Sequence, residues 1–395
     1  MVGAVPPVRL KDAGAVTADA LIVGGGLAGG ALATALAEAG RSVVLLEREA
    51  GPHDKVCGEF LSREAILYLN KLGVDPLALG ACRIHSVRLS SGSGIATVRL
   101  PFPALSLSRR ALDHALLKRA AAAGADIRLG SRVQALEGGA GAWWARLSTG
   151  TEILGDAAFL ASGKHDLRGW PRPDGLQRDL IGFKMHLTLS PEQAARLAGH
   201  VELALFRGGY AGLEPVEDGR ANLCLLVRQS RYAALGQSWE ALLAAMRADN
   251  AMLAERLDGA QACWDRPLAI FSIPYGYVRR NGDGAGADQP WRLGDQAAVI
   301  PSFAGDGMSI ALHSACLAAT HYMRGETAAA YQRRMARDVG TAVRAATLLS
   351  QLSVHGPGRV LIGWGASRLP KIMASVAALT RVPPGALRRA GLDVA

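Results

Sequence analysis

Three glycines near the start of the sequence have the spacing of a phosphate-binding turn. Gly24, Gly26 and Gly29 form a Gly-x-Gly-x-x-Gly motif between the apolar run 20–23 and the Ala- and Leu-rich segment 31–39. In a strand–turn–helix unit, the first glycine makes the tight turn, the second lets the backbone approach a pyrophosphate, and the third lets the helix pack against the strand. The N-terminus of the helix also offers unpaired N–H groups to the phosphates. The motif therefore predicts a dinucleotide site.

A carboxylate follows the next apolar run. Glu47 ends the segment 43–46, 18 residues after Gly29. An acid at the end of the second strand of a parallel βαβ unit can accept hydrogen bonds from the hydroxyls of a ribose. We therefore expect Glu47 to bind a nucleotide ribose. The other cofactor-binding residues predicted around this motif are Leu27, Ala28 and Arg48.

The composition excludes several classes of protein. The 395 residues suggest two or three domains, and 50% hydrophobic against 20% charged residues excludes a disordered chain. The formal net charge is +10, but the sequence has no Lys/Arg block interleaved with aromatic residues, so we predict no nucleic-acid partner. The five cysteines form no CxxC pair, and no apolar run is long enough for a secretion signal or a membrane span. The expectation is a cytoplasmic protein without a disulfide framework or a metal site.

Helix-forming and strand-forming segments alternate along the chain. The segment 83–100 is typical of a hairpin, and the segment 181–227 again alternates in the manner of β-strands. This order predicts an α/β fold in which a Rossmann-like dinucleotide-binding domain is interleaved with an antiparallel β-sheet substrate domain, followed by a helical C-terminal tail. The predicted bounds are 1–82, 101–175 and 281–330 for the first domain, 83–100 and 176–280 for the second, and 331–395 for the tail.

A second glycine-rich region indicates which dinucleotide is bound. Gly294-Asp295 follows a strand-like run, and Pro301 and Gly305-x-Gly307-Met308 come next, before a helix of small residues. This order resembles the Gly-Asp motif of the para-hydroxybenzoate hydroxylase fold, in which the aspartate hydrogen-bonds a ribityl hydroxyl of FAD and the following turn faces the flavin. The resemblance implies an FAD-binding domain with non-covalent FAD. It adds two cofactor-binding residues, Val133 and Arg109, the latter at the start of a segment similar to the family's Arg-x-x-Leu-Asp helix start.

Two segments are nearest to the geranylgeranyl reductase and flavin halogenase branch of that fold. The loop 55–59, Lys-Val-Cys-Gly-Glu, resembles the loop of this branch, and Ser162 stands where the aromatic hydroxylases carry an aspartate used for both FAD and the nicotinamide. We therefore expect NAD(P)H as the electron donor, used directly or through a separate flavin reductase. The tryptophans typical of halogenases and geranylgeranyl reductases are missing before Pro274, which implies a different substrate.

Three flavin reactions stay open. The favoured one is hydroxylation of an aromatic or polyketide-like small molecule of secondary metabolism through a flavin C4a-hydroperoxide. The alternatives are reduction or dehydrogenation of an apolar or prenylated substrate, and a halogenase-like reaction. A flavin-bound protein without enzymatic activity is the last hypothesis. Because a His or Tyr can deprotonate a phenol, the candidate catalytic residues are Cys57, His186 and Tyr210, with Lys184, Tyr275 and Tyr277 as further polar groups of the predicted pocket.

The C-terminal tail is basic and amphipathic. Asp393 is the only acid between positions 339 and 394. The apolar residues of the tail, with their basic neighbours, predict a segment that caps the pocket, with peripheral contact to a membrane surface as the alternative. These apolar residues are Leu361, Ile362, Trp364, Leu369, Ile372 and Met373.

Overall fold

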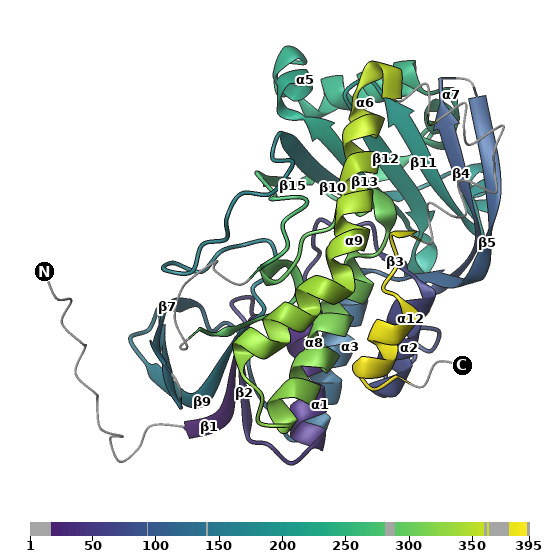
Figure 1. Cartoon of the computed structure of the whole chain (residues 1–395). Coiled ribbons are helices and arrows are strands. Elements are labelled where there is room, and N and C mark those ends of the chain that lie inside the picture. The colour runs from purple at the N-terminus through teal and green to yellow at the C-terminus, as the bar shows by residue number, and fades with distance from the viewer. Residues whose placement is uncertain are drawn as a thin grey trace, which may run out of the picture.

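Two sheets and the helices packed on them make up the computed structural model of the chain (Figure 1). The structure describes residues 17–92, 94–139, 141–280, 289–358, 362 and 379–392. Most of the predicted cap therefore lies outside the described residues, namely Leu361, Trp364, Leu369, Ile372 and Met373. In the part of the chain that is described, no helix is both long and apolar enough to cross a bilayer.

The first sheet is a parallel sheet with an antiparallel extension. Strands β6, β2, β1 and β9 run parallel in that order, β8 and β7 continue the sheet as antiparallel strands, and β16 adds to β9 in parallel. The aliphatic runs of β1 and β2 suit central parallel strands, which are buried on both faces. The strands are β1 (Thr17–Val23), β2 (Val43–Leu46), β6 (Asp126–Arg128), β7 (Val133–Gly139), β8 (Ala142–Leu147), β9 (Glu152–Leu160) and β16 (Trp291–Arg292).

Small side chains let the helices of this unit pack closely. A Cβ added to Gly30 in α1 would lie 3.1 Å from the Cβ of Leu116 in α3, so glycine sets the approach of these two helices. Helix α8 packs against α1, α2 and α9, and buried residues of all four helices share one apolar cluster. The helices are α1 (Leu27–Glu38), α2 (Arg63–Lys71), α3 (Arg109–Ala122), α8 (Gly307–Met323), α9 (Ala328–Val354) and α12 (Pro384–Arg389).

The second sheet is antiparallel except at one pair. Its order is β14-β10-β13-β12-β11-β4-β5-β3, with β15 on β10, and β11 pairs with β4 in parallel. That parallel pair joins the hairpin β4–β5 to the later strands. The strands are β3 (Phe60–Leu61), β4 (Cys82–Ser91), β5 (Gly94–Ser106), β10 (Leu180–Thr188), β11 (His200–Phe206), β12 (Gly209–Pro215), β13 (Ala221–Arg228), β14 (Gln261–Ala262) and β15 (Leu268–Phe271).

The two faces of this sheet differ because side chains alternate along each strand. Ala211 and Leu213 of β12 and Leu223 of β13 share an apolar cluster with the helices on one face. The alternate residues of β12, such as Tyr210 and Glu214, line a cavity on the other face. The helices here are α4 (Pro191–Leu197), α5 (Gln229–Ala234), α6 (Trp239–Asp249) and α7 (Ala251–Arg256), and three short 3₁₀ turns are η1 (Glu217–Gly219), η2 (Gly294–Gln296) and η3 (Ser302–Ala304).

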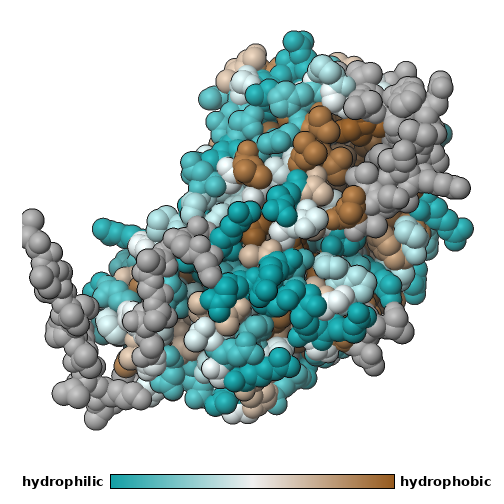
Figure 2. Space-filling view, viewed as in Figure 1, coloured by the Kyte–Doolittle hydropathy of each residue, from teal (hydrophilic) through white to brown (hydrophobic). Residues whose placement is uncertain are grey.

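The long helix α9 links the two units. It contacts β16 of the first sheet and β11 and β12 of the second, and Figure 1 shows it running along both. Near its C-terminal end, Leu348 and Leu352 are exposed, and Gln351 donates a hydrogen bond to the carbonyl of the exposed Leu176. Figure 2 shows hydrophobic side chains gathered in this region on a face that is otherwise mostly hydrophilic.

The predicted fold class is confirmed, and one predicted element is shorter than expected. The strand-like run before Gly294 forms a strand only at β16 and is followed by the 3₁₀ turn η2. Gly294 has a φ of 56°, a left-handed conformation that ends the extended chain.

Candidate functional site

A large cavity lies between the glycine turn of the first sheet and the second sheet. Its volume is about 1240 Å³, above the 300–1,000 Å³ typical of one ligand site, so it has room for a cofactor and a substrate together. The lining includes the turn after β1, the end of β2, the loop 53–60, residues 161–168, 293–295 and 302–305, and side chains of β4, β5, β11 and β12.

The glycine turn has no room for side chains at two of its three motif positions. Gly24 has a φ of 109°, and a Cβ there would lie 2.5 Å from the carbonyl oxygen of Ala161. A Cβ on Gly29 would lie 1.9 Å from the carbonyl oxygen of Gly24. Gly26 is the N-cap of α1, and no side chain caps that helix end. The N–H groups of the first turn are therefore free of a side-chain cap at the cavity, where phosphate oxygens can accept them.

Glu47 is held at the end of β2 by two backbone N–H groups. Its Oε2 accepts from Gly25 at 2.6 Å and its Oε1 from Glu49 at 3.0 Å, and the residue is 7% exposed. These bonds fix the carboxylate beside the glycine turn. Glu47 and Arg48 both line the cavity, which is the position that ribose binding requires.

Two cations stand beside the same turn. Asp113 accepts hydrogen bonds from Arg109 at 2.8 and 2.9 Å and from Lys55 at 2.8 Å. Burial would raise the pKa of Asp113, but Arg109 and Lys55 lower it below its usual range, so it is a carboxylate that orients both cations. Each cation has a nitrogen 3.4 Å from the place of a Cβ on Gly26. Their charge adds to the helix dipole where a pyrophosphate would bind.

The second glycine-rich region reaches the cavity from the other side. Asp295 lines the cavity, and among the described residues no hydrogen bond or ion pair engages its carboxylate. Gly305 has a φ of 68° and leads into α8, whose N-cap Asp306 makes no side-chain cap. The N-termini of α1 and α8 thus both lie at this cavity, which the acids Glu47 and Asp295 also line. This donor and acceptor set fits FAD, whose pyrophosphate and flavin carbonyls accept and whose ribose and ribityl hydroxyls donate.

Most of the predicted cofactor residues line the cavity and two do not. Gly29 is buried in α1 and Pro301 precedes η3, so both shape the backbone without lining the cavity. The residues that line it are Gly24, Gly26, Leu27, Ala28, Glu47, Arg48, Arg109, Val133, Gly294, Asp295, Gly305, Gly307 and Met308.

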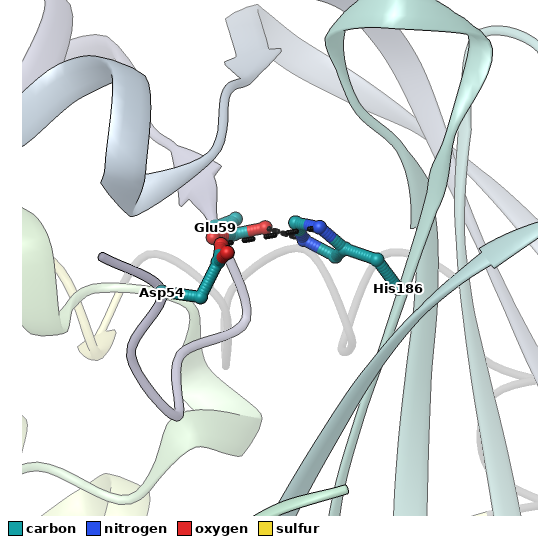
Figure 3. A group of neighbouring side chains, drawn as sticks. All are labelled: Asp54, Glu59 and His186. Atoms are coloured by element: carbon teal, nitrogen blue, oxygen red, sulfur yellow. Dashed lines mark hydrogen bonds and ion pairs between the residues drawn. The ribbon is translucent and has the colours of Figure 1, made fainter. Parts of the chain in front are cut away.

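A buried group of charges lies where the loop 53–60 meets β10 (Figure 3). Glu59 Oε2 accepts from His186 Nε2 at 2.8 Å, and its Oε1 accepts from Lys184 and from the backbone N–H of Arg109 at 2.7 Å. All three side chains, Glu59, Lys184 and His186, are fully buried. Burial would raise the pKa of Glu59, but His186 and Lys184 lower it below its usual range, so Glu59 is an anion.

The positive charge of Lys184 offsets the negative charges of Asp54 and Glu59 in this group. Asp54, Glu59 and His186 have ligand atoms within 4.8 Å of one another, a spacing that suits a metal ion (Figure 3). Lys184 Nζ hydrogen-bonds Glu59, however, and lies 3.5 Å from Asp54 Oδ1. The ammonium therefore already supplies the positive charge that the two carboxylates attract.

The three candidate catalytic residues have different surroundings. His186 is fully buried, bonds Glu59 and does not line the cavity, so the structure does not bring it to the substrate. Tyr210 lines the cavity, but its hydroxyl already lies 3.1 Å from Ser302 Oγ and accepts from the N–H of Phe303 at 2.9 Å. Cys57 lines the cavity, and its Sγ accepts from the N–H of Glu59 at 3.4 Å.

An acid of the cavity, Glu214, was not identified from the sequence. Glu214 lies in β12, is 3% exposed and lines the cavity. The signal was the alternation of Gly-Tyr-Ala-Gly-Leu-Glu-Pro in the segment 209–215, which puts Glu214 on the same face as Tyr210, opposite the apolar Ala211 and Leu213.

Known proteins resemble this chain in sequence and structure. Residues 17–152 match the family described as FAD binding domain. The menaquinone reductase of Mycolicibacterium smegmatis is 29% identical over 380 residues, 86% of this chain and 87% of that protein. The squalene monooxygenase of Rattus norvegicus is 32% identical over 87 residues, 22% of this chain and 15% of that protein. The crystal structure of halogenase PltM in complex with phloroglucinol and FAD has a TM-score of 0.70 at 16% identity and covers 85% of this chain and 76% of its own.

These findings agree with the resemblance drawn from the sequence. The family match covers the glycine turn, Glu47 and Arg109. The likeness to the halogenase structure extends over both sheets and shows the fold. The predicted flavoprotein fold and the FAD cofactor are therefore confirmed.

Proposed function

We propose that this chain, an FAD-dependent oxidoreductase of the para-hydroxybenzoate hydroxylase fold, reduces a carbon–carbon double bond of an apolar, prenylated substrate. One observation carries the proposal: the second sheet presents an aliphatic stretch to the cavity, called the wall below. Three strands contribute it, and its residues are Val87, Leu89, Val98, Leu100, Val201 and Leu203.

An aliphatic wall favours an extended apolar substrate. Burial of apolar surface contributes about 25 cal/mol per Å², so a hydrocarbon chain gains affinity along the whole wall. These six side chains offer no hydrogen bonds to the several hydroxyls of a polyphenol. The wall thus suits a prenyl chain better than a polar aromatic ring.

The groups expected to activate a phenol are engaged elsewhere. Hydroxylation of an aromatic substrate is assisted by a base that removes a phenolic proton. His186 bonds Glu59 away from the cavity, and the hydroxyl of Tyr210 is held by Ser302 and Phe303. Burial also raises the pKa of Tyr210 above its ordinary range, so it is a poor proton acceptor. These contacts weigh against the hydroxylation that the sequence favoured.

The likeness to menaquinone reductase supports the same substrate class. That protein covers 86% of this chain, and its name specifies a quinone with a prenyl side chain as substrate. The loop with Cys57 and Glu59, which resembles that of geranylgeranyl reductases, lies at the cavity. We propose NAD(P)H as the source of electrons, directly or through a separate flavin reductase.

The chain contributes binding, orientation and the exclusion of water. Reduced FAD, when bound, supplies a hydride equivalent. Lys55 and Arg109, fixed by Asp113, bind the pyrophosphate, and Glu47 binds the ribose. Phe303 packs edge-on against Tyr210 at 5.1 Å between ring centres, and this apolar contact helps to exclude water from the wall.

A second candidate, oxygenation of the same apolar class of substrate, is favoured by the likeness of 87 residues to squalene monooxygenase. The two candidates differ in product: reduction adds two hydrogen atoms, whereas oxygenation adds one oxygen atom and requires O₂.

The experiment uses FAD-loaded protein, reduced with dithionite without oxygen and mixed with a polyprenyl naphthoquinone. Because a quinone ring also takes electrons directly from reduced flavin, the readout is the mass of the side chain after the ring is re-oxidised in air. We expect a gain of two hydrogens, and an analogue with a saturated chain stays unchanged. A product formed only with O₂, and heavier by one oxygen atom, contradicts the reduction.

A pair of variants tests the wall itself. Leu100→Gln places an amide in the wall and should raise KM roughly 10-fold or more, because burial of one leucine is worth about 1.5–3 kcal/mol. Leu77→Gln changes a leucine that is 40% exposed and outside the cavity lining, and should leave KM unchanged. Equal KM values for both variants would contradict a substrate bound along this wall.

A further inference from the structure

Glu214 is an acid on an otherwise apolar stretch of the cavity. It follows Tyr210 and Gly212 on the cavity face of β12, while Leu213 faces the helices. In the register of the sheet it stands opposite Asn222 of β13. The neighbouring strand β11 contributes Val201 and Leu203 to the same face.

One oxygen of the Glu214 side chain lacks the partners that a buried carboxylate requires. The residue is 3% exposed, and its Oε1 is buried with no hydrogen-bond partner among the described residues. Across the strand, Asn222 donates to the carbonyl of Cys57 at 3.1 Å, and its own Oδ1 is also buried and unpartnered. A buried anion in this place would lack compensation, whereas a neutral acid is tolerated.

Glu59 and Glu214 line one cavity but differ in protonation. Glu59 is bonded by Lys184, His186 and a backbone N–H and is an anion. Burial raises the pKa of Glu214 well above its usual range, and the negative charge of Glu59 raises it further, while a hydrogen bond from Asn222 and the charge of Lys184 oppose this in part. Two carboxyls whose pKa values are shifted in opposite directions can act as an anion and an acid in one site, and the carboxyl with the raised pKa, Glu214, is suited to donate a proton.

We propose that Glu214 is the proton donor for the reduction of the substrate double bond. The proposal rests on the proposed function. One alkene carbon receives the hydride from reduced FAD, the π electron pair forms a bond from the other carbon to the proton of Glu214, and Glu214 is left as a carboxylate. The product thus gains two hydrogens and FAD returns to its oxidised form. A proton from solvent then restores the acid.

The first test needs neither substrate nor turnover. Infrared spectra of the FAD-loaded protein at neutral pH should contain the carbonyl band of a protonated carboxylic acid, and Glu214→Gln should remove it. Glu240→Gln is the matched control, because Glu240 is an exposed glutamate of α6 whose pKa is lowered by a hydrogen bond from Ser238. Its loss should leave the band in place. A wild-type protein without the band, or a band that survives in Glu214→Gln, overturns the proposal.

The second test separates the two half-reactions. Reduction of the bound flavin by dithionite should proceed at the wild-type rate in Glu214→Gln. Saturation of the prenyl side chain by the reduced protein should be slower by about 100-fold or more, the contribution typical of a general acid. Glu214→Asp, which keeps an acid, should recover part of that loss. Side-chain saturation within about twofold of wild type in a folded, FAD-loaded Glu214→Gln protein overturns the proposal.

The two proposals fail in different ways. If wild type saturates the prenyl chain but Glu214→Gln does so equally well, the reduction stands and the proton comes from elsewhere. If wild type does not saturate the chain at all, the proposed reduction fails, and the role of Glu214 as its proton donor fails with it, whatever the infrared spectrum shows.

Discussion

Replacing Lys184 by methionine removes the positive charge beside Asp54 and Glu59, two of the three side chains drawn in Figure 3. Methionine has a similar length and no charge, so the change leaves the packing of β10 largely intact. Glu59 then keeps His186 and the N–H of Arg109 as partners, but loses the ammonium that hydrogen-bonds its Oε1. Both Lys184 and Glu59 are fully buried, so solvent cannot replace the lost partner.

The expected cost follows from that burial. Removing one partner of a buried ion pair costs about 3–5 kcal/mol, because the remaining charge is uncompensated. Domain stabilities are about 5–15 kcal/mol, so this is a large share of the total. Arg196→Met serves as the control on the same domain. Arg196 pairs with Glu192 and Glu255, but its side chain is 51% exposed, so its loss should cost no more than about 1 kcal/mol.

The assay is chemical denaturation of both variants and of Lys184→Met/Glu59→Gln. The double variant leaves no anion at position 59, so it should recover most of the stability that Lys184→Met loses. The reasoning is refuted if Lys184→Met costs no more than Arg196→Met, or if Glu59→Gln gives no recovery.

Three further predictions concern the cofactor site and acid stability. Gly29→Ala should abolish FAD binding in a flavin-quenching titration, because its Cβ would lie 1.9 Å from the carbonyl oxygen of Gly24. The control Gly51→Ala, with open space around the new methyl group, should bind FAD normally. Equal FAD affinities of the two variants would contradict the steric argument. Glu47→Gln should weaken FAD binding in the same titration by about 1.5–3 kcal/mol, roughly 10- to 100-fold, because charge-assisted acceptance is lost; an unchanged Kd would count against ribose binding by Glu47. Burial would raise the pKa of Asp338, but hydrogen bonds from His313, Arg334 and Arg389 lower it below its usual range. Its contribution to stability is therefore complete at neutral pH and is lost as pH falls below the ordinary carboxyl range, so the stability gap between wild type and Asp338→Asn, measured by denaturation, should narrow below about pH 4. A gap that stays constant with pH would show that the charge of Asp338 is not the cause.

The cofactor site could be predicted because its causes are local. The contact of Gly29 with the carbonyl of Gly24 arises within one turn, so the requirement for glycine appears as a fixed spacing in the sequence. Glu47 is likewise placed by the end of the strand that precedes it. The order of strands and helices then indicated two interleaved units.

The substrate side could not be predicted in the same way because its contacts join distant segments. Lys184 and His186 bond Glu59 across 125 and 127 residues, and no spacing in the sequence records that pairing. The polar character of His186 suggested chemistry in the pocket, but its partner Glu59 holds it away from the cavity. The alternation of side chains in the segment 209–215 was sufficient to predict that Glu214 faces the cavity. It was overlooked because the adjoining segment 201–206 gave the stronger strand pattern.

The parallel pairing of β4 with β11 has a consequence for how the protein is made. Neither sheet is built from one continuous stretch, since β16 and α8 complete the first unit only after the whole second sheet has been translated. A nascent chain on the ribosome therefore leaves part of the first core uncovered until β16 and α8 have emerged. Premature release or nicking between the units would leave fragments with open cores, so half-molecules should aggregate unless they are expressed together.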